Sequence, residues 1–298
     1  MTRTVIRDTA GDRLFMAFNY LVLTLLFVVI LYPLIYVVSA SFSSGQAVTS
    51  GRVWFWPVEP TLAGYEAIFK NRGVLLGFYN SLFYTVVGTL INVVMTILAA
   101  YPLSRPELPG RRVIAFLFFF TLLFSGGLIP TYLVVRDLGM LSTRWAMLIP
   151  GALSVWNVLI ARTFFENNIP RELREAAELD GCDDFNFLWR VVLPLSGSIL
   201  AVLALFYGVG HWNSYFSALI YLYDQNLWPL QLVLRNILIQ NQVDPGMVVD
   251  ARDMAAKAQL RELLKYSLIV VATVPLLIVY PFVQRHFVKG VMIGSVKG

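Results

Sequence analysis

The chain has 298 residues, a formal net charge of +5 and a single cysteine, Cys182. Hydrophobic residues make up 58% of it and charged residues 14%, whereas ordinary soluble domains contain about 45–50% and about 25%. This composition excludes an ordinary soluble domain and indicates a membrane protein. One cysteine cannot form an internal disulfide, so no part of the prediction depends on an oxidising compartment.

Six segments contain no Asp, Glu, Lys or Arg: residues 14–38, 73–104, 113–135, 145–161, 191–223 and 266–284. A helix crosses the hydrocarbon core in roughly 20 residues, with a range of about 17–25. Segment 145–161 lies at the lower limit, and the two longest segments must include flanking structure. The first run, with 25 residues, exceeds the apolar region of a signal peptide, which has about 7–15. The sequence predicts an all-α membrane protein with six transmembrane helices.

The basic residues give the orientation of these helices. With an inner N-terminus, the segments 1–13, 104–112, 162–190 and 285–298 carry a slight excess of Lys and Arg over the outer segments. Basic residues in short loops favour the cytoplasmic side, although Arg136 and Arg144 in a short outer loop oppose this bias. The charge therefore reflects membrane orientation, and no nucleic-acid partner is predicted.

The second predicted span carries one polar face. Thr85, Thr89, Asn92 and Thr96 are spaced 4, 3 and 4 residues apart, which places them on one side of a helix. In lipid, such a face turns toward another helix or a wet cavity. Hydrogen bonding between helices is the leading interpretation, and contact with a substrate is the alternative.

The fifth predicted span contains the densest polar run, His211-Trp212-Asn213-Ser214-Tyr215. Polar side chains at membrane depth are costly and face protein or water. Aromatic rings beside amides suit a sugar, which has apolar C–H faces and a hydroxyl rim. His211, Trp212, Asn213 and Tyr215 are therefore candidate substrate-pathway residues, with Asn92 as a weaker one. Anchoring at the membrane interface is an equally good interpretation.

Three further features lie outside these faces. Residues 125–130, Ser-Gly-Gly-Leu-Ile-Pro, interrupt the third span and predict a bend near its outer end. The tryptophans at 54 and 56 suit a membrane–water interface. The outer segment 224–265 is long, has a predicted turn at residues 244–246, and is too long to be a simple connection.

Residues 162–190 form a charged island between two uncharged segments. Pro170 suits a first helical turn and Gly181 suits a left-handed helix end, so a short helix is predicted from Arg171 to Asp180. Ion pairs Arg171–Glu175 and Arg174–Glu178 would contribute only about 0.2–0.5 kcal/mol each. Such pairs do not explain a polar helix at this place, and docking to a partner does.

A second helix is predicted directly after this one. Asp183 or Asp184 can cap it. Its apolar residues recur at i, i+3, i+4 and i+7, which predicts one stripe that a protein or membrane surface covers: Phe185, Leu188, Trp189 and Val192.

Several chemistries have no signature in the sequence. No Lys is followed by Ser or Thr, so there is no P-loop, and the chain has neither His-Glu-x-x-His nor Gly-x-Ser-x-Gly. The six uncharged segments have no Asp or Glu for a proton or sodium relay. We predict no catalytic residue, no metal site and no cofactor. The pathway is expected to be powered by another chain.

The spacing of the charged island resembles a known loop. Glu175-Ala176-Ala177, then Gly181, then Val191-Val192-Leu193-Pro194 is similar to the cytoplasmic loop of the membrane subunits of bacterial ABC importers, with Val191 where that family usually has Ile. The resemblance implies a type I importer fold over residues 73–285, both termini in the cytoplasm, and docking of loop 162–194 onto a separate ATPase. The implied coupling residues are Glu175, Ala176, Ala177, Gly181, Leu193 and Pro194.

Two other stretches, 124–132 and 287–298, look like the branch of this family that takes up oligosaccharides from polysaccharides. The resemblance implies an inner-membrane permease working by alternating access. Its partners would be a second permease, usually a different chain, two ATP-binding subunits, an extracytoplasmic sugar-binding protein and the lipid bilayer. Some members carry uronic-acid oligomers and others neutral glycans.

The predicted organisation has four parts. Residues 1–13 form a cytoplasmic tail, 14–72 the first span with an outer segment, 73–285 the importer core, and 286–298 a cytoplasmic tail. The outer segment 224–265 is expected to contact the sugar-binding protein, with a folded cap on the outer mouth as the alternative. Two other functional classes stay open, a self-sufficient secondary carrier and a non-transporting scaffold that recruits a cytoplasmic partner.

Overall fold

The computed structural model describes residues 9–240 and 262–281, and within these ranges the regular secondary structure is entirely helical. This confirms the all-α prediction. The chain divides into two compact units, each taken by itself below. The described residues of the first unit are 9–70 and 262–271, and those of the second are 71–240 and 272–281.

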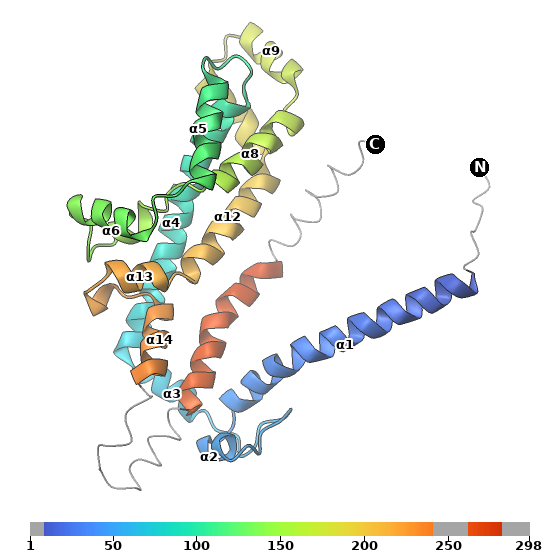
Figure 1. The fold of residues 1–298 in the computed structure, drawn as a ribbon, viewed down its shortest axis with the longest axis vertical. Coiled ribbons are helices and arrows are strands. Elements are labelled where there is room, and N and C mark those ends of the chain that lie inside the picture. Colours follow the sequence, from blue (N-terminus) through green and yellow to red (C-terminus); the bar gives the residue numbers. More distant parts are fainter. Residues whose placement is uncertain (1–8, 241–261, 282–298) are drawn as a thin grey trace. The chain divides into compact units, whose positions relative to one another are not determined.

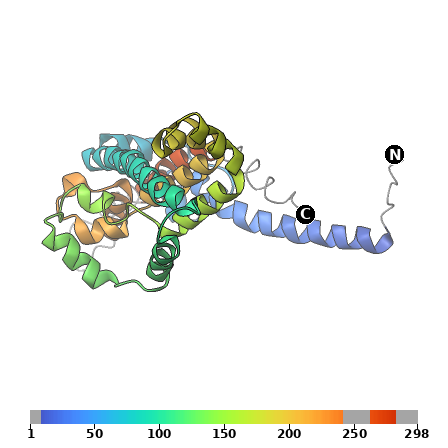
Figure 2. The same cartoon turned by 90° about the horizontal axis from the view of Figure 1, so that it is seen from above.

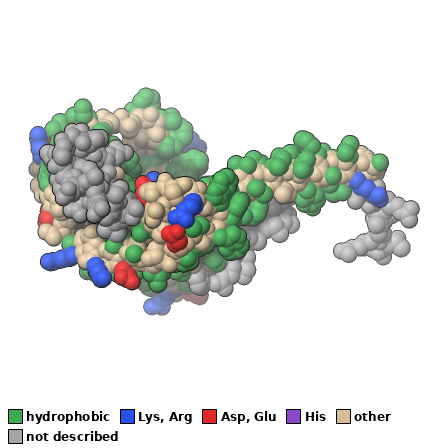
Figure 3. All heavy atoms as spheres, turned by 90° about the horizontal axis from the view of Figure 1, so that it is seen from below, with side chains coloured by type: hydrophobic (Ala, Val, Ile, Leu, Met, Phe, Trp, Pro, Cys, Tyr) green, Lys and Arg blue, Asp and Glu red, His purple; other side chains and the backbone are tan. Residues whose placement is uncertain are grey.

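The first unit begins with a long apolar helix. Its elements are α1 (Ala10–Ser41), α2 (Gly45–Thr49), α3 (Ala63–Lys70) and the start of the last helix (Glu262–Pro281). Thr9 and Asp12 form a capping box that starts α1, so part of the predicted tail 1–13 is already helical. Hydrophobic side chains are exposed along α1 (Figure 3), as expected of a helix covered by lipid or by another membrane subunit.

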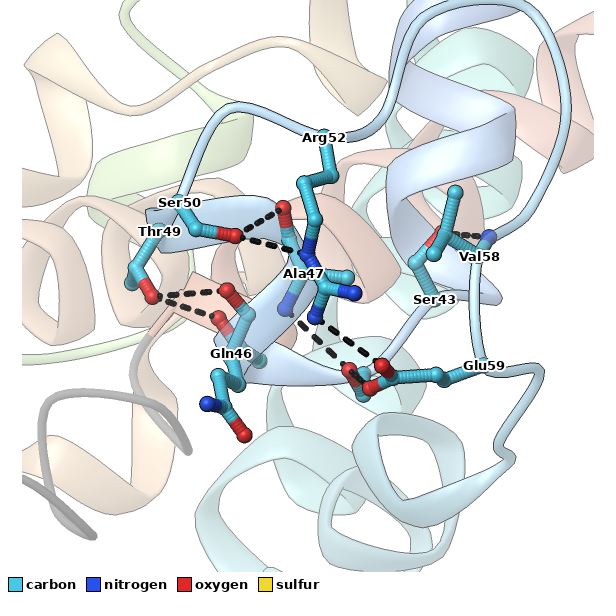
Figure 4. A network of polar contacts seen from close by, with 10 residues as sticks. Ser43, Gln46, Ala47, Thr49, Ser50, Arg52, Val58 and Glu59 are labelled. Atoms are coloured by element: carbon cyan, nitrogen blue, oxygen red, sulfur yellow. Dashed lines mark hydrogen bonds and ion pairs between the residues drawn. The ribbon is translucent and has the colours of Figure 1, made fainter.

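A network of polar contacts orders the segment that follows α1 (Figure 4). Ser43 Oγ accepts a hydrogen bond from the Val58 backbone N–H at 3.0 Å. The Glu59 carboxylate accepts one from Ser44 Oγ at 2.5 Å and pairs with Arg52 at 2.9 Å. Ser43 and Ser44 therefore tie two irregular segments together, and Ser44 also caps α2.

The second unit is built around α4 (Arg72–Ser104), which contacts α12, α8 and α14. The other elements are α5 (Arg111–Leu123), α6 (Leu128–Asp137), α7 (Trp145–Leu148), α8 (Val155–Asn168), α9 (Arg171–Leu179), α10 (Asp184–Phe187), the π-helix η1 (Leu188–Val192), α11 (Leu193–Leu195), α12 (Gly197–Trp212), α13 (Phe216–Tyr221), η2 (Gln225–Leu227) and α14 (Leu230–Gln240). Figure 1 shows α9 at one end of this bundle and α13 and α14 toward the other. The two ends of α4 therefore lie near different helices.

Three helices are long and apolar enough to cross a membrane, namely α1, α4 and Glu262–Pro281. The number rises to five if two bent pairs count as one span each. One pair, α5 with α6, bends by 112°, which confirms the predicted break in the third span; the other joins Asp184–Leu195 to α12 at 83°. Predicted segment 145–161 is divided between α7 and the 14-residue α8. Six transmembrane helices therefore stay a prediction.

Candidate functional site

The predicted polar helix is α9, and it ends one residue before the predicted end. Gly181 has a φ of +74°, in the left-handed region that suits glycine. This turn lets the Cys182 backbone N–H donate to the Ala177 carbonyl at 2.8 Å and that of Gly181 donate to the Glu178 carbonyl at 3.0 Å. The last carbonyls of α9 are thus satisfied by a glycine-dependent C-terminal cap.

Arg174 ties α9 to the segments on both sides of it. Its guanidinium lies 2.7 Å from Glu107 in the loop between α4 and α5, 2.7 Å from Glu178, and 3.7 Å from Asp184 at the start of α10. A backbone N–H and the Arg174 guanidinium hold the pKa of the Glu107 carboxyl below its usual value. The predicted Arg174–Glu178 pair is present, so one partly buried arginine fixes the orientation of α9.

The opposite face of α9 is free. None of its residues is buried, Glu175 and Ala176 are exposed, and Leu179 is 90% exposed. Glu175 makes no ion pair with any described residue, so the predicted Arg171–Glu175 pair is absent from this part of the chain. Ala177 turns inward and packs against the core of the bundle. The helix therefore presents a carboxylate and a leucine outward.

The second helix of the loop departs from its prediction. Asp183 caps α10 by accepting a hydrogen bond from the Asn186 N–H at 2.7 Å, and the same contact lowers the pKa of its carboxyl. The predicted apolar stripe does not form: Leu188 and Val192 are buried, whereas Phe185 and Trp189 are 71% and 67% exposed.

The π-helix η1 runs through the predicted stripe. Its i→i+5 hydrogen bonds differ from those of the α-helix for which the stripe was predicted. Beyond η1, Leu193 packs partly against the core and Pro194 is exposed. Phe185, Trp189 and Pro194 are therefore exposed, whereas Leu188 and Val192 anchor this segment in the core.

A cavity of about 390 Å³ lies in the second unit, among α6, α7, α12 and α13. Its polar and aromatic lining comes from α6, α12, α13 and the segment after α7: Thr131, Gly151, Tyr207, His211, Ser214, Ser217 and Tyr221. Among the residues that the structure describes, no Asp, Glu, Lys or Arg lines it. Hydroxyls, aromatic rings and one imidazole are groups that can bind a sugar by hydrogen bonds and stacking.

His211 and Asn92 meet at the edge of this cavity. The Asn92 Nδ2 amide donates to the Gly151 carbonyl at 2.5 Å, which leaves its Oδ1 facing His211 Nε2 at 2.6 Å. Asn92 is fully buried. A side chain on Gly88 would meet the imidazole ring, because a Cβ there would lie 2.6 Å from His211 Cε1. Two predicted residues, far apart in sequence, are thus brought together.

Only part of the remaining polar face of α4 makes hydrogen bonds to other elements. Thr96 Oγ1 and the Tyr207 hydroxyl lie 2.7 Å apart, and that hydroxyl also accepts from the Ser154 N–H at 3.1 Å. Thr85 and Thr89 have buried hydroxyls without a hydrogen-bond partner among the described residues. Bonding between helices therefore describes Asn92 and Thr96 but leaves two hydroxyls unexplained.

The other predicted pathway residues lie away from the cavity lining. Trp212 is 4% exposed and its indole N–H donates to the Ala272 carbonyl at 2.9 Å. Asn213 ends α12 and donates to the Val209 carbonyl at 2.9 Å. Tyr215 is 44% exposed and rests edge-on against Phe216. The described structure gives Trp212 a packing role, because its polar edge is already satisfied.

Side chains of α4 also hold the start of the predicted outer segment, 224–265. Asn80 Nδ2 donates to the carbonyls of Asn226 and Trp228 at 2.7 and 3.1 Å, and Tyr84 donates to that of Leu227 at 2.9 Å. This segment is folded against α4 through η2 and α14. The predicted turn at residues 244–246 lies outside the described residues, as does the tail 286–298. Within the described ranges no His, Cys, Asp and Glu cluster could hold a metal.

These features define a class, a multi-pass membrane protein with a tethered polar helix at one end of the second unit. Residues 72–293 match the family of binding-protein-dependent transport system inner membrane components, and the chain belongs to this family. It is therefore a membrane-spanning permease subunit of a binding-protein-dependent ABC importer, in the inner membrane. Such importers combine a partner permease, ATP-binding subunits and a substrate-binding protein. The resemblance drawn from the charged island is confirmed.

Similar proteins cover nearly the whole chain. It is 42% identical over 288 residues to the polygalacturonan/rhamnogalacturonan transport system permease protein YtcP of Bacillus subtilis (strain 168), covering 96% of this chain and 99% of that protein. It is 40% identical over 291 residues to Protein LplC of the same organism, covering 98% and 97%. A solved bacterial ABC transporter involved in the import of the acidic polysaccharide alginate contains a chain with 35% identity and a TM-score of 0.87, covering 94% and 99%.

Proposed function

We propose that this chain is one of two different permease subunits of an ATP-driven importer, and that its substrate is an oligosaccharide containing uronic acids. The relatives named for polygalacturonan, rhamnogalacturonan and alginate all handle acidic polysaccharides, and they cover almost the entire chain. The cavity lining fits this proposal, because it contains no carboxylate that would repel an acidic sugar. A neutral glycan is the alternative within the same mechanism.

The observation that carries the proposed mechanism is the free outer face of α9. Glu175 is exposed and unpaired, Leu179 is 90% exposed, and Arg174 fixes the opposite face. A helix held in this way can transmit a push from a bound ATPase subunit to α8 and α10 without bending away. In this proposal Glu175, Ala176, Ala177, Gly181, Leu193 and Pro194 form the contact with the ATP-binding subunit or support it.

The topology belongs to the same proposal. Six transmembrane helices with cytoplasmic termini place α9 in the cytoplasm and the segment 224–240 outside, toward the sugar-binding protein. The cavity at Asn92, Tyr207 and His211 then lies on the sugar route, which is opened alternately to each side. No described feature favours a carrier driven by an ion gradient, because the cavity lining lacks the acidic residues that proton or sodium relays use.

Substrate class is tested with the reconstituted importer and its binding protein. Oligogalacturonides should stimulate ATP hydrolysis more strongly than neutral galacto-oligosaccharides of the same length. Equal stimulation by both sugars, or stimulation by the neutral sugar alone, would reject the acidic substrate.

Docking is tested at the cap of α9. Gly181→Val forces a β-branched residue into the left-handed region and should lower stimulated ATP hydrolysis, whereas Gly181→Asn, which tolerates that region, should retain most of it. Glu175→Lys should lower it while membrane insertion is kept. Normal stimulation in Gly181→Val and Glu175→Lys would reject the docking role of α9.

A further inference from the structure

A second cavity lies near the same end of the second unit as α9, between α5 and α8. Its volume is about 510 Å³. Arg111 and Arg112 reach it from the first turn of α5, and Arg162 reaches it from α8. The α5 residues Phe116 and Phe119, together with Leu159 on α8, line the remainder. One part of the cavity is therefore basic and the other apolar.

The basic part has more positive charge than its own carboxylate can balance. Glu166 pairs with Arg111 and, at 3.0 Å, with Arg162. Arg111 also donates from Nε to the Leu103 carbonyl at 2.8 Å. Arg112 makes no hydrogen bond or ion pair with any described residue. Two guanidinium groups thus share one carboxylate while that of Arg112 pairs with no described residue, and the side chains of Arg111 and Arg162 are only 25% exposed.

The apolar part belongs to a helix that has no buried residue. Phe116 and Phe119 are 62% and 48% exposed, as are other large side chains all round α5. Figure 2 shows α5 at the periphery of the second unit rather than in its centre. Because residues 113–123 contain no charge, this face suits the acyl chains of a membrane, and the arginines stand where the uncharged run begins.

We propose that this cavity binds an anionic phospholipid, with the headgroup phosphate on Arg112 and Arg162 and an acyl chain along Phe116 and Phe119. Guanidinium groups bind phosphate through paired, charge-assisted hydrogen bonds, and basic pockets between membrane helices suit anionic headgroups. A soluble anion would leave the apolar part unused, and a zwitterionic lipid would leave the excess positive charge unbalanced. The site does not depend on the transported sugar.

The lipid would join α5 to the end of α8 that leads into α9. Its loss should therefore loosen the connection between these helices without removing a residue that contacts an ATPase or a sugar. The connection between α5 and α8, next to the proposed docking helix α9, would then be sensitive to lipid.

Native mass spectrometry of the purified full-length chain tests the site, with phosphatidylglycerol and phosphatidylcholine titrated in parallel. Wild-type protein should retain phosphatidylglycerol preferentially. Arg112→Gln should weaken this binding about tenfold, the effect of losing one charge-assisted contact, and Arg112→Lys should restore part of it. Arg136→Gln removes the same charge from α6, where the arginine pairs with Asp137 at 2.9 Å, and should bind as wild type does.

Four results would overturn the proposal. Equal losses in Arg112→Gln and Arg136→Gln would mean that overall charge, not this cavity, attracts the lipid. Unchanged binding in Arg112→Gln would remove the arginine from the site. Full competition by soluble glycerol phosphate would show that the apolar part is not used. A cross-link from position 112 to an acidic side chain of the partner permease in the assembled importer would assign the cavity to a protein contact.

Discussion

His211 on α12 and Asn92 on α4 are joined by a contact of 2.6 Å between the imidazole Nε2 and the amide Oδ1. The donation from Asn92 Nδ2 to the Gly151 carbonyl at 2.5 Å fixes which end of the amide faces the ring. His211 therefore donates from Nε2 to the amide oxygen of Asn92. One buried asparagine thus sets the orientation of the imidazole at the edge of the cavity.

Gly88 provides the space that this arrangement needs. Gly88→Ala would place a Cβ 2.6 Å from His211 Cε1, so the ring must move and lose Asn92. We expect sugar uptake to fall sharply and the free energy of unfolding to decrease by about 1–3 kcal/mol, measured by transport assay and thermal unfolding in detergent. Gly208→Ala is the control, because its Cβ would lie 3.6 Å from Thr89 Oγ1, an ordinary contact. Similar behaviour of the two variants would contradict this account.

Arg174 is expected to matter for coupling more than for stability. Arg174→Ala removes ion pairs to three carboxylates that are themselves largely exposed, and such pairs contribute about 0–1 kcal/mol each. The chain should still insert and assemble, yet sugar-stimulated ATP hydrolysis should fall because α9 is no longer held. Arg171→Ala, on the same helix and without an ion pair among the described residues, should keep normal stimulation. Equal stimulation in both variants would refute the positioning role of Arg174.

The two kinds of threonine on α4 should respond differently to removal of the hydroxyl. Thr96→Val breaks the 2.7 Å contact with Tyr207 and should destabilise the protein by about 0.5–1.5 kcal/mol. Thr85→Val removes a buried hydroxyl that has no partner, so it should be neutral or stabilising. Thermal unfolding of the two variants side by side measures the difference. A larger loss of stability in Thr85→Val than in Thr96→Val would contradict this prediction.

Asp183 should make the start of α10 depend on pH. Its folded pKa is lowered by the Asn186 N–H and side-chain amide, so the cap stabilises α10 fully above the unfolded pKa of about 3.9. The stabilisation is lost as the pH falls through the lower, folded pKa. Hydrogen exchange of the Asn186 amide, corrected for intrinsic rates, should show this loss. Asp183→Asn should keep the protection without the pH dependence, and Asp183→Ala should lose it throughout; protection in the alanine variant would contradict the cap.

The sequence predicted the features that depend on local chemistry. Pro170 and Gly181 bounded α9 within one residue, because a helix start and a left-handed cap are set by neighbouring residues. The break in the third span also followed from local Gly and Pro residues. The polar spacing on α4 placed Asn92 on an inward face, as the structure has it.

The rest depended on packing between distant segments. Leu188 and Val192 are buried in a segment that forms the π-helix η1, and the spacing of the neighbouring residues does not predict a π-helix. Trp212 satisfies its N–H with the Ala272 carbonyl, 60 positions away. In the sequence Tyr207 reads as one more core residue, and only the structure shows that it pairs with Thr96 and lines the cavity. The apolar run that forms α14 was a usable signal for a helix inside the outer segment.

The most direct measurement of the central claim is uptake of a labelled oligogalacturonide into vesicles. One set of vesicles contains the complete importer with its binding protein, and a second contains the permease pair without the ATP-binding subunits. We expect uptake only in the complete set and only when ATP is supplied on the side that carries α9. Uptake by the permease pair alone, driven by a proton or sodium gradient, would show that the chain is a self-sufficient carrier.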